Sequence, residues 1–340
     1  MHSIDLSKYS YRTDLILDEM DNVSDKANHS DYDGIKVDSL KIDNSNKGKF
    51  NKNSGDYITI TFKDVTDKDN FKKVEEVLIT ELKKILDNYK IAGKKILVVG
   101  LGNSKSTPDA LGPKVIDSIL VTNHLFEIGE VEDGYERVCS FKPQVTGSTG
   151  IETSDMIKNL VTTINADILI VIDALASSSI ERVNKTIQIS TGGISPGSGV
   201  GNDRKEISPK TINIPVIAIG VPTIVDAVTI VGDTLKYMLK KISYKIDNID
   251  NVKLKLVTDS NQDYSAHETN LSKELKEKIL GMVGTLNEED LKLLIYEVLS
   301  PIGYNLMVTP KEIDFVIEKL SLLIANGINK SIHKRFNPTN

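Results

Sequence analysis

Hydrophobic and polar positions follow two periods along this chain, and together they predict an α/β fold. Three continuous aliphatic runs, at 96–99, 168–172 and 216–219, are typical of strands covered on both faces, as in a parallel sheet. Between the runs, apolar residues recur at helical spacing. We therefore expect a mostly parallel twisted sheet with helices on both faces and right-handed crossovers. An alternating stretch at 57–62 predicts one further, half-buried strand.

Composition along the chain predicts how this core is extended. Residues 1–54 are polar with scattered apolar positions, which indicates loose attachment. Residues 240–272 are strongly charged and predict an exposed insertion or link. A helical C-terminal part begins at about 273, and the capping-box spacing of 285–288 and 309–312 places helix starts near 286 and 310. Residues 16–340 are thus interpreted as one α/β domain.

The bulk numbers exclude several classes of protein. With 39% hydrophobic residues, 5% aromatics and no Trp, the chain predicts a soluble protein with an aliphatic core. Every apolar run is shorter than the roughly 20 residues that cross a bilayer, and no export signal opens the chain, so we expect an intracellular protein. The net charge of −6 argues against direct nucleic-acid binding and suits a basic partner.

Cysteine and histidine offer little chemistry. The single cysteine, Cys139, excludes an internal disulfide, and without a histidine near it in sequence it is interpreted as inert. The five histidines are scattered and form no His-x-x-x-His pair, so metal ligation is not expected of them. They are His2, His29, His124, His267 and His333.

The glycine-rich segments are ambiguous. Gly100 and Gly102 follow the first aliphatic run, but Lys105 stands where a dinucleotide fingerprint needs its third glycine, so a tight turn is the simpler reading. A second segment, 191–202, could either cradle a substrate backbone through Gly197, Ser198 and Gly199 or be a plain connection. The residues themselves do not decide between these two.

Carboxylates are the remaining candidates for chemistry. Asp109, Asp173 and Asp226 come after the three aliphatic runs, and the carboxyl ends of parallel strands meet at one edge of a sheet. Each could merely cap a turn or helix. If Asp109 and Asp173 converge, however, one keeps its proton while the other is charged. Such a pair can take a proton from water and donate one to a peptide carbonyl, which is hydrolysis.

Nine short segments, spread in order along nearly the whole chain, resemble the spore germination proteases. They are VVGLGN (98–103), TPDALGPK (107–114), TGIETSD (149–155), IDALA (172–176), PGSGVGN (196–202), IPVIAIG (214–220), VPTIVDA (221–227), GMVGTL (281–286) and NLMVTPKE (305–312). The resemblance implies a core similar to the hydrogenase-maturation proteases and a self-processing endopeptidase with two essential aspartates. These fall on Asp109 and Asp173.

The resemblance also implies substrates, assembly and processing. The substrates would be small acid-soluble spore proteins that coat DNA. The enzyme would be a homotetramer without metal or cofactor. It would be located in the cytoplasm of the developing spore and in the spore core. Residues 5–15 look like part of a propeptide spanning 1–15, with cleavage near Leu15–Ile16. Glu152, Arg204 and Lys205 are candidates to assist substrate binding. A metal-dependent maturation protease and a non-enzymatic binding scaffold are the alternatives.

Overall fold

The computed structural model describes residues 14–20, 27–197, 204–251, 264, 267–299 and 306–336. Within them the chain forms two compact units, a larger one of residues 14–225 and 309–336 and a smaller one of residues 226–308. The helices of the larger unit are α1 (Ile16–Met20), α2 (Lys68–Tyr89), α3 (Leu111–Ile116), α4 (Asn123–Ile128), α5 (Thr146–Thr149), α6 (Thr153–Ile164), α7 (Pro209–Ile212) and α11 (Ile313–Ile332).

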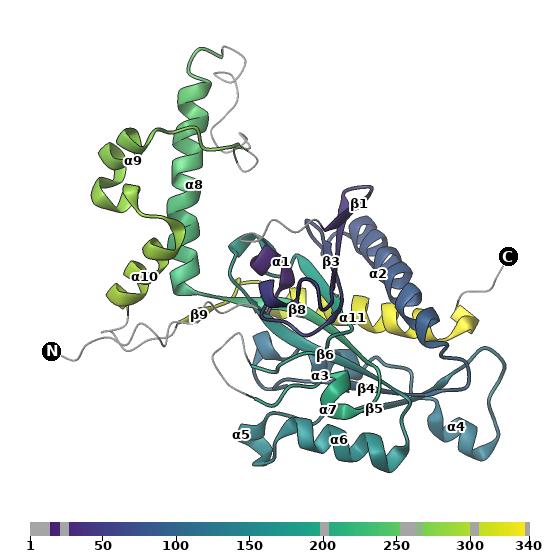
Figure 1. The fold of residues 1–340 in the computed structure, drawn as a ribbon. Coiled ribbons are helices and arrows are strands. Elements are labelled where there is room, and N and C mark those ends of the chain that lie inside the picture. The colour runs from purple at the N-terminus through teal and green to yellow at the C-terminus, as the bar shows by residue number, and fades with distance from the viewer. Residues whose placement is uncertain are drawn as a thin grey trace. The chain divides into compact units, whose positions relative to one another are not determined.

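A mixed sheet forms the centre of the larger unit, with strand order β1-β2-β3-β7-β8-β6-β4-β5 (Figure 1). Pairing is parallel from β8 through β6 and β4 to β5, and antiparallel from β1 to β8. The α/β class is confirmed, but the expected mostly parallel sheet needs correcting, because only the half that carries the aspartates is parallel. The strands are β1 (Asn28–Tyr32), β2 (Ile35–Ile42), β3 (Gly55–Thr61), β4 (Lys95–Gly100), β5 (Arg137–Phe141), β6 (Ile168–Ser177), β7 (Thr186–Ser190) and β8 (Val216–Asp226).

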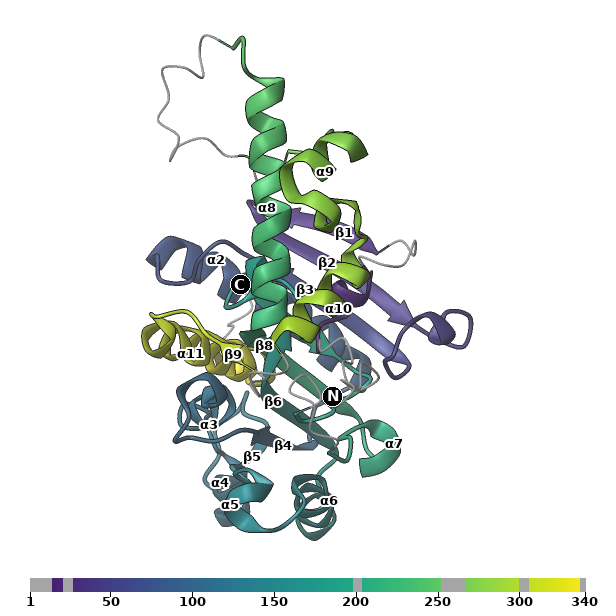
Figure 2. The same ribbon diagram turned by 90° about the vertical axis from the view of Figure 1, so that its left-hand side faces the viewer.

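Helices cover both faces of this sheet, as the continuous aliphatic runs predict. Alternate residues of β4 point to opposite sides: Val98 belongs to a core shared with α2, α3 and α11, whereas Val99 packs with α6 and α7. Figures 1 and 2 show these two helix layers on either side of the strands. The central strands are thus buried on both faces, which explains why they lack polar alternation.

The N-terminal region departs from its prediction. Instead of hanging loosely, residues 28–42 form the hairpin β1–β2, and β2 pairs with β3. The buried positions of β2 change parity, since Ile35 and Val37 face the larger core while Leu40 and Ile42 pack with α1. This change hides the strand period in the sequence. Because α1 covers the second face, β3 is buried on both sides rather than half-buried.

The smaller unit is helical. It contains α8 (Ala227–Asp247), α9 (Lys273–Leu280), α10 (Glu288–Leu299) and the short strand β9 (Met307–Val308). Helix α8 continues through Asp247, so the start of the expected 240–272 insertion is helical, while 252–263 lie outside the described residues. Ser243 on α8 accepts a hydrogen bond from the Asn270 N–H at 3.1 Å, which ties the segment before α9 to α8.

Both predicted C-terminal helices exist, but they start slightly later than expected. The Asp290 N–H donates to Asn287 Oδ1 at 2.8 Å, so Asn287 rather than Thr285 caps α10. Helix α11 begins at Ile313, and the Thr309 hydroxyl donates to the Thr223 carbonyl instead of capping it. None of the helices in the described part of the chain is long and apolar enough to cross a membrane.

Two leucines on α11 test the core assignment. Leu320 is 0% exposed and Leu322 is 45% exposed on the same helix. We expect Leu320→Ala to lower the free energy of unfolding by about 2–5 kcal/mol because it leaves a cavity. The matched change Leu322→Ala should stay within about 0.5 kcal/mol. Chemical denaturation of both variants checks this, and equal losses would contradict the packing described.

Candidate active site

The parallel half of the sheet places the two selected aspartates at one edge. In the register of β4 and β6, Gly100 at the end of β4 lies opposite Ile172, so Asp173 is the first residue of β6 beyond its shorter neighbour. Strand β6 continues to Ser177, paired with β8 on its other side. Asp173 therefore lies inside a strand rather than at its end, in the corner that opens where β4 stops. Asp109 follows β4 through a tight loop.

Glycines allow this loop to fold back on the sheet. Gly102 has φ +106, and a Cβ there would overlap the carbonyl oxygen of Asp109. A Cβ on Gly112 would overlap the Leu101 carbonyl oxygen and come within 2.7 Å of that of Ile172. The loop thus packs backbone against backbone, which side chains at these positions would prevent. The interpretation of Gly102 as part of a tight turn after the strand agrees with this geometry.

Hydrogen bonds fix Asp109 in the loop. The Asn103 N–H donates to both the Asp109 Oδ2, at 2.8 Å, and its carbonyl oxygen, at 3.1 Å. From β8, the Thr223 hydroxyl donates to the Pro108 carbonyl at 2.7 Å. The loop is therefore attached to the neighbouring strand as well as to itself. Burial raises the pKa of Asp109, and the Asn103 N–H partly offsets this by stabilising the charged form.

Asp173 lies deeper, with 5% of its surface exposed. Burial raises its pKa well above the ordinary value, and the negative charges of Asp109 and Asp14 raise it further. The Ala174 N–H donates to Asp173 Oδ1 at 2.9 Å and acts in the opposite sense. The pKa of Asp173 is thus raised further than that of Asp109, which favours Asp173 as the group that holds a proton. This is the division that acid–base chemistry on one water molecule requires.

The segment expected to be processed lies against the same strand. Leu15 and Ile16 are buried. Asp14 pairs with Ala176 of β6: its N–H donates to the Ala176 carbonyl at 3.1 Å, and its Oδ2 accepts from the Ala176 N–H at 3.0 Å. Because Ala176 is three residues beyond Asp173, this contact brings the Asp14 charge to the aspartate pair.

The remaining candidates lie around the start of α6. Glu152 and Arg204 approach each other at 3.7 Å, and Lys205 forms an ion pair with Asp155 at 2.8 Å. Since α6 leads from β5 into β6, its N-terminus is at the same edge of the sheet as the aspartates. Gly197 has φ +73, while Ser198 and Gly199 lie outside the described residues.

Other sequence candidates have structural roles. Asp226 accepts from the Thr229 N–H at 2.6 Å and caps α8. Burial raises the pKa of the Cys139 thiol, which disfavours the reactive thiolate. Within the described ranges, no group of three or more His, Cys, Asp or Glu side chains is arranged to hold a metal ion.

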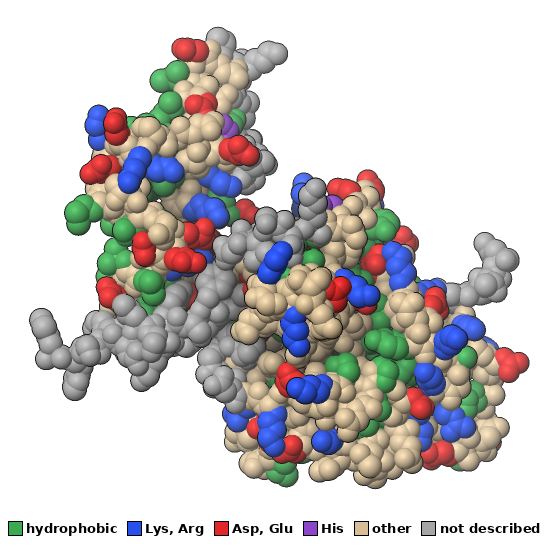
Figure 3. Space-filling model, viewed as in Figure 1, with side chains coloured by type: hydrophobic (Ala, Val, Ile, Leu, Met, Phe, Trp, Pro, Cys, Tyr) green, Lys and Arg blue, Asp and Glu red, His purple; other side chains and the backbone are tan. Residues whose placement is uncertain are grey.

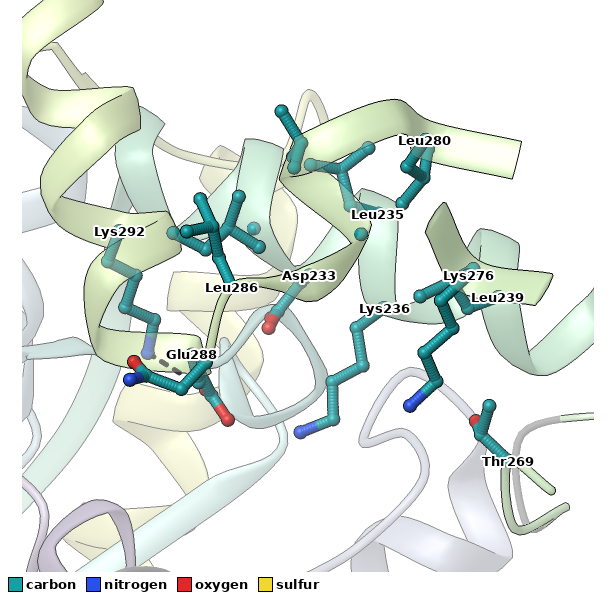
Figure 4. A pocket seen from close by; sticks show the side chains of 15 residues that line it. Asp233, Leu235, Lys236, Leu239, Thr269, Lys276, Leu280, Leu286, Glu288 and Lys292 are labelled. Atoms are coloured by element: carbon teal, nitrogen blue, oxygen red, sulfur yellow. Dashed lines mark ion pairs between the residues drawn. The ribbon is translucent and has the colours of Figure 1, made fainter. Parts of the chain in front are cut away.

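A separate cavity of about 230 Å³ lies within the smaller unit, between α8, α9 and α10 (Figure 4). Leucines such as Leu235, Leu239 and Leu280 line it, with Lys236 and Lys276 among them. None of the candidate catalytic or substrate-binding residues lines it.

Sequence reasoning missed three contributors to the site. The first is Asp14, whose charge acts on Asp173. The other two are Thr223 of β8 and Gln188 of β7. The Gln188 side chain accepts from the Ile16 N–H at 2.7 Å and donates to the Asp14 carbonyl at 3.1 Å. Asp14 carried a signal, as the acidic residue before the expected cleavage. Nothing in the sequence connects Gln188 to residues more than 170 positions away.

A pair of glycines tests the loop that carries Asp109. Gly34 and Gly102 both have positive φ, but only at Gly102 would a Cβ meet other atoms. We expect Gly34→Ala to lower the free energy of unfolding by about 1–2 kcal/mol, because of backbone strain alone. Gly102→Ala should lower the free energy of unfolding by clearly more, because it also displaces Asp109. Urea unfolding of both variants measures this, and equal costs would disprove the close approach.

The buried Asp173 carboxyl predicts a pH-dependent stability. Its raised pKa means that the folded protein disfavours the charged form, so stability is lost as pH rises above the unfolded value of about 3.9. Asp173→Asn should therefore be more stable than wild type near pH 7, by about 1.4 kcal/mol per unit of pKa elevation, and the difference should shrink toward pH 4. Unfolding curves across this range check it. A difference that does not change with pH would contradict the assignment.

Comparisons with known proteins cover nearly the whole chain. A family model described as germination protease matches residues 8–340. The germination protease of Priestia megaterium is 42% identical over 360 residues, covering 99% of this chain and 97% of that protein. That of Bacillus cytotoxicus is 41% identical over 357 residues, with the same coverage.

A solved [NiFe] hydrogenase maturation protease from Thermococcus kodakarensis aligns with 41% of this chain and 80% of its own at a TM-score of 0.26 and 15% identity, a likeness too weak to carry an argument. The matches over nearly the full length show that the chain belongs to the germination protease family.

Proposed function

We propose that this protein is a self-processing endopeptidase that degrades small acid-soluble DNA-binding spore proteins during germination, with Asp109 and Asp173 activating water. The support for the proposal is that the loop that carries Asp109 packs against β6, the strand that carries the buried Asp173. Asp109 raises the pKa of Asp173. Membership of the germination protease family supports the peptidase activity and the spore context.

The two carboxyl groups take complementary roles in this mechanism. The Asp109 carboxylate removes a proton from water as the oxygen attacks the peptide carbonyl carbon. Protonated Asp173 donates its proton to the carbonyl oxygen, which stabilises the charge that develops there. When the tetrahedral intermediate collapses, the leaving amine takes a proton from Asp109 and Asp173 recovers its own from the hydroxyl. Both groups return to their starting state.

Surface charge is consistent with protein substrates of this kind. Acidic and basic side chains are interspersed on the face shown in Figure 3, and the chain carries a net charge of −6. A basic DNA-coating protein is attracted by such a charge, whereas nucleic acid is not. Assembly as a homotetramer and residence in the spore core complete the proposal.

Self-processing is proposed to remove residues 1–15 near the Leu15–Ile16 bond. The support is positional: Asp14 pairs with Ala176 on the strand that carries Asp173, so the segment to be cut lies close to the aspartates. The candidate residues Glu152, Arg204 and Lys205 at the α6 N-terminus are proposed to help bind substrates at the same edge.

Substitution of the aspartates tests the mechanism. Asp109→Asn and Asp173→Asn should fold yet lose self-shortening and substrate cleavage by about a thousandfold or more, because neither water activation nor carbonyl protonation survives alone. Mass spectrometry after incubation at mildly acidic pH measures both self-shortening and substrate cleavage. The control is Asp117→Asn, an exposed aspartate that pairs with Lys142 and should leave the rate unchanged. Normal shortening by either active-site variant would refute the role given to that residue.

A further inference from the structure

The pairing of β8 with β6 is interrupted at Thr223. Leu175 of β6 lies opposite Pro222, but the next residue, Ala176, lies opposite Ile224. Thr223 is therefore an extra residue with no counterpart on β6, that is, a β-bulge. Bulges interrupt the ladder and bend a strand, and they are over-represented next to active sites, where they set the direction of a side chain. Pro222 suits this position because a proline has no N–H to donate to a ladder.

The bulge residue carries a buried hydroxyl that reaches the loop of Asp109. Thr223 is 1% exposed, and its hydroxyl donates to the Pro108 carbonyl at 2.7 Å. A buried hydroxyl or carbonyl without a partner is costly, so neither group gives up this bond easily. The Thr223 carbonyl in turn accepts from the Thr309 hydroxyl at 2.9 Å. The bulge residue is thus held through both its side chain and its backbone.

The carbonyl that accepts from Thr223 directly precedes Asp109. A short 3-10 turn, η3 (Thr107–Asp109), is closed by the Ala110 N–H, which donates to the first carbonyl of the turn at 3.1 Å. The next carbonyl, that of Pro108, is available to Thr223, and its peptide unit leads straight into Asp109. The Thr223 hydroxyl therefore holds the backbone from which the Asp109 side chain extends.

The start of the same loop is attached to the strand that carries Asp173. The Leu101 N–H donates to the Ile172 carbonyl at 2.8 Å, and Ile172 directly precedes Asp173. The loop is thus attached to β6 at its start and to β8 at its end, and these two strands pair with each other. The bond to β6 fixes where the loop leaves the sheet, whereas the bond to Thr223 fixes the end that carries Asp109.

We infer that Thr223 is a positioning residue for peptide hydrolysis: its hydroxyl, placed by the bulge in β8, holds the carbonyl before Asp109 and so keeps the Asp109 carboxylate near Asp173. This inference rests on the proposed function and deepens it, because it names a residue outside the aspartate pair on which the geometry of the pair depends. A misplacement of about 1 Å can cost a hundredfold in rate, so such a support affects catalysis directly.

Isosteric changes of single threonines test the inference in the full-length chain, with a small acid-soluble spore protein as the substrate. Thr223→Val replaces the hydroxyl by a methyl group. It should lower kcat about ten- to hundredfold with little change in KM, because Thr223 is buried and holds a catalytic group rather than the substrate. Thr223→Ser keeps the hydroxyl and should recover most of the rate.

The matched control is Thr59→Val in β3. Thr59 is 0% exposed, and its hydroxyl has no hydrogen-bond partner within the described residues, so kcat should not change. Loss of a buried hydroxyl is common to both valine variants, and only Thr223→Val releases the loop of Asp109.

The protonation of Asp173 gives a measurement that lost stability alone would not change. The Asp109 charge raises the pKa of Asp173, so displacement of Asp109 in Thr223→Val should lower that pKa. Thr59→Val and the destabilised Leu320→Ala should leave it unchanged. NMR titration of aspartate carboxyl carbons measures this in the folded variants.

The outcomes separate the inference from the proposed function. A Thr223→Val enzyme with the kcat of Thr59→Val, or with an unchanged Asp173 pKa, overturns the positioning role, while an inactive Asp173→Asn leaves the proposed function standing. If Thr223→Val does not fold, Thr309→Val decides: it removes the bond to the Thr223 carbonyl and should lower kcat about two- to tenfold, and a wild-type kcat would overturn the inference. Full activity in Asp173→Asn would refute the proposed function itself.

Discussion

The structure depends on one close approach: the backbone of the loop after β4 lies directly against the backbone of β6. Gly112 permits it, because a Cβ there would come within 2.7 Å of the Ile172 carbonyl oxygen on β6. Gly102 lets the loop close on itself, because a Cβ there would overlap the Asp109 carbonyl oxygen. The approach places Asp109 beside a strand that continues past the end of β4 and so brings it to Asp173. Asp173 is buried more deeply than Asp109, so burial first and the nearby Asp109 charge second raise the pKa of Asp173, and the asymmetry between the two carboxyl groups follows from that.

The same corner explains why the N-terminal segment is bound and not free. Strand β6 extends beyond its neighbour β4, so its last residues have backbone groups available for another chain segment. Asp14 uses them, and its carboxylate adds a second negative charge near Asp173, besides that of Asp109.

The sequence predicts the parallel half of the fold and the strands that the candidate carboxylates follow, because both come from local patterns. Continuous aliphatic runs mark strands buried on two faces, and the residues after such runs gather at one edge. The hairpin β1–β2 could not be predicted in this way, because Ile35 and Leu40 face opposite cores and break the strand period. Nor could Gln188, whose contacts with Asp14 and Ile16 depend on tertiary packing alone. Thr309 shows the reverse case, a good capping signal whose hydroxyl bonds Thr223 instead.

The central claim is that Asp109 lies close enough to the buried Asp173 for its charge to raise the pKa of Asp173. An NMR titration of aspartate carboxyl carbons in wild type and in Asp109→Asn measures this directly. The account predicts that Asp173 in the wild-type protein titrates well above the ordinary range of an aspartate, and that its pKa falls when Asp109 loses its charge but stays raised by burial. An Asp173 that titrates in the ordinary range, or whose pKa is the same in both proteins, would contradict it.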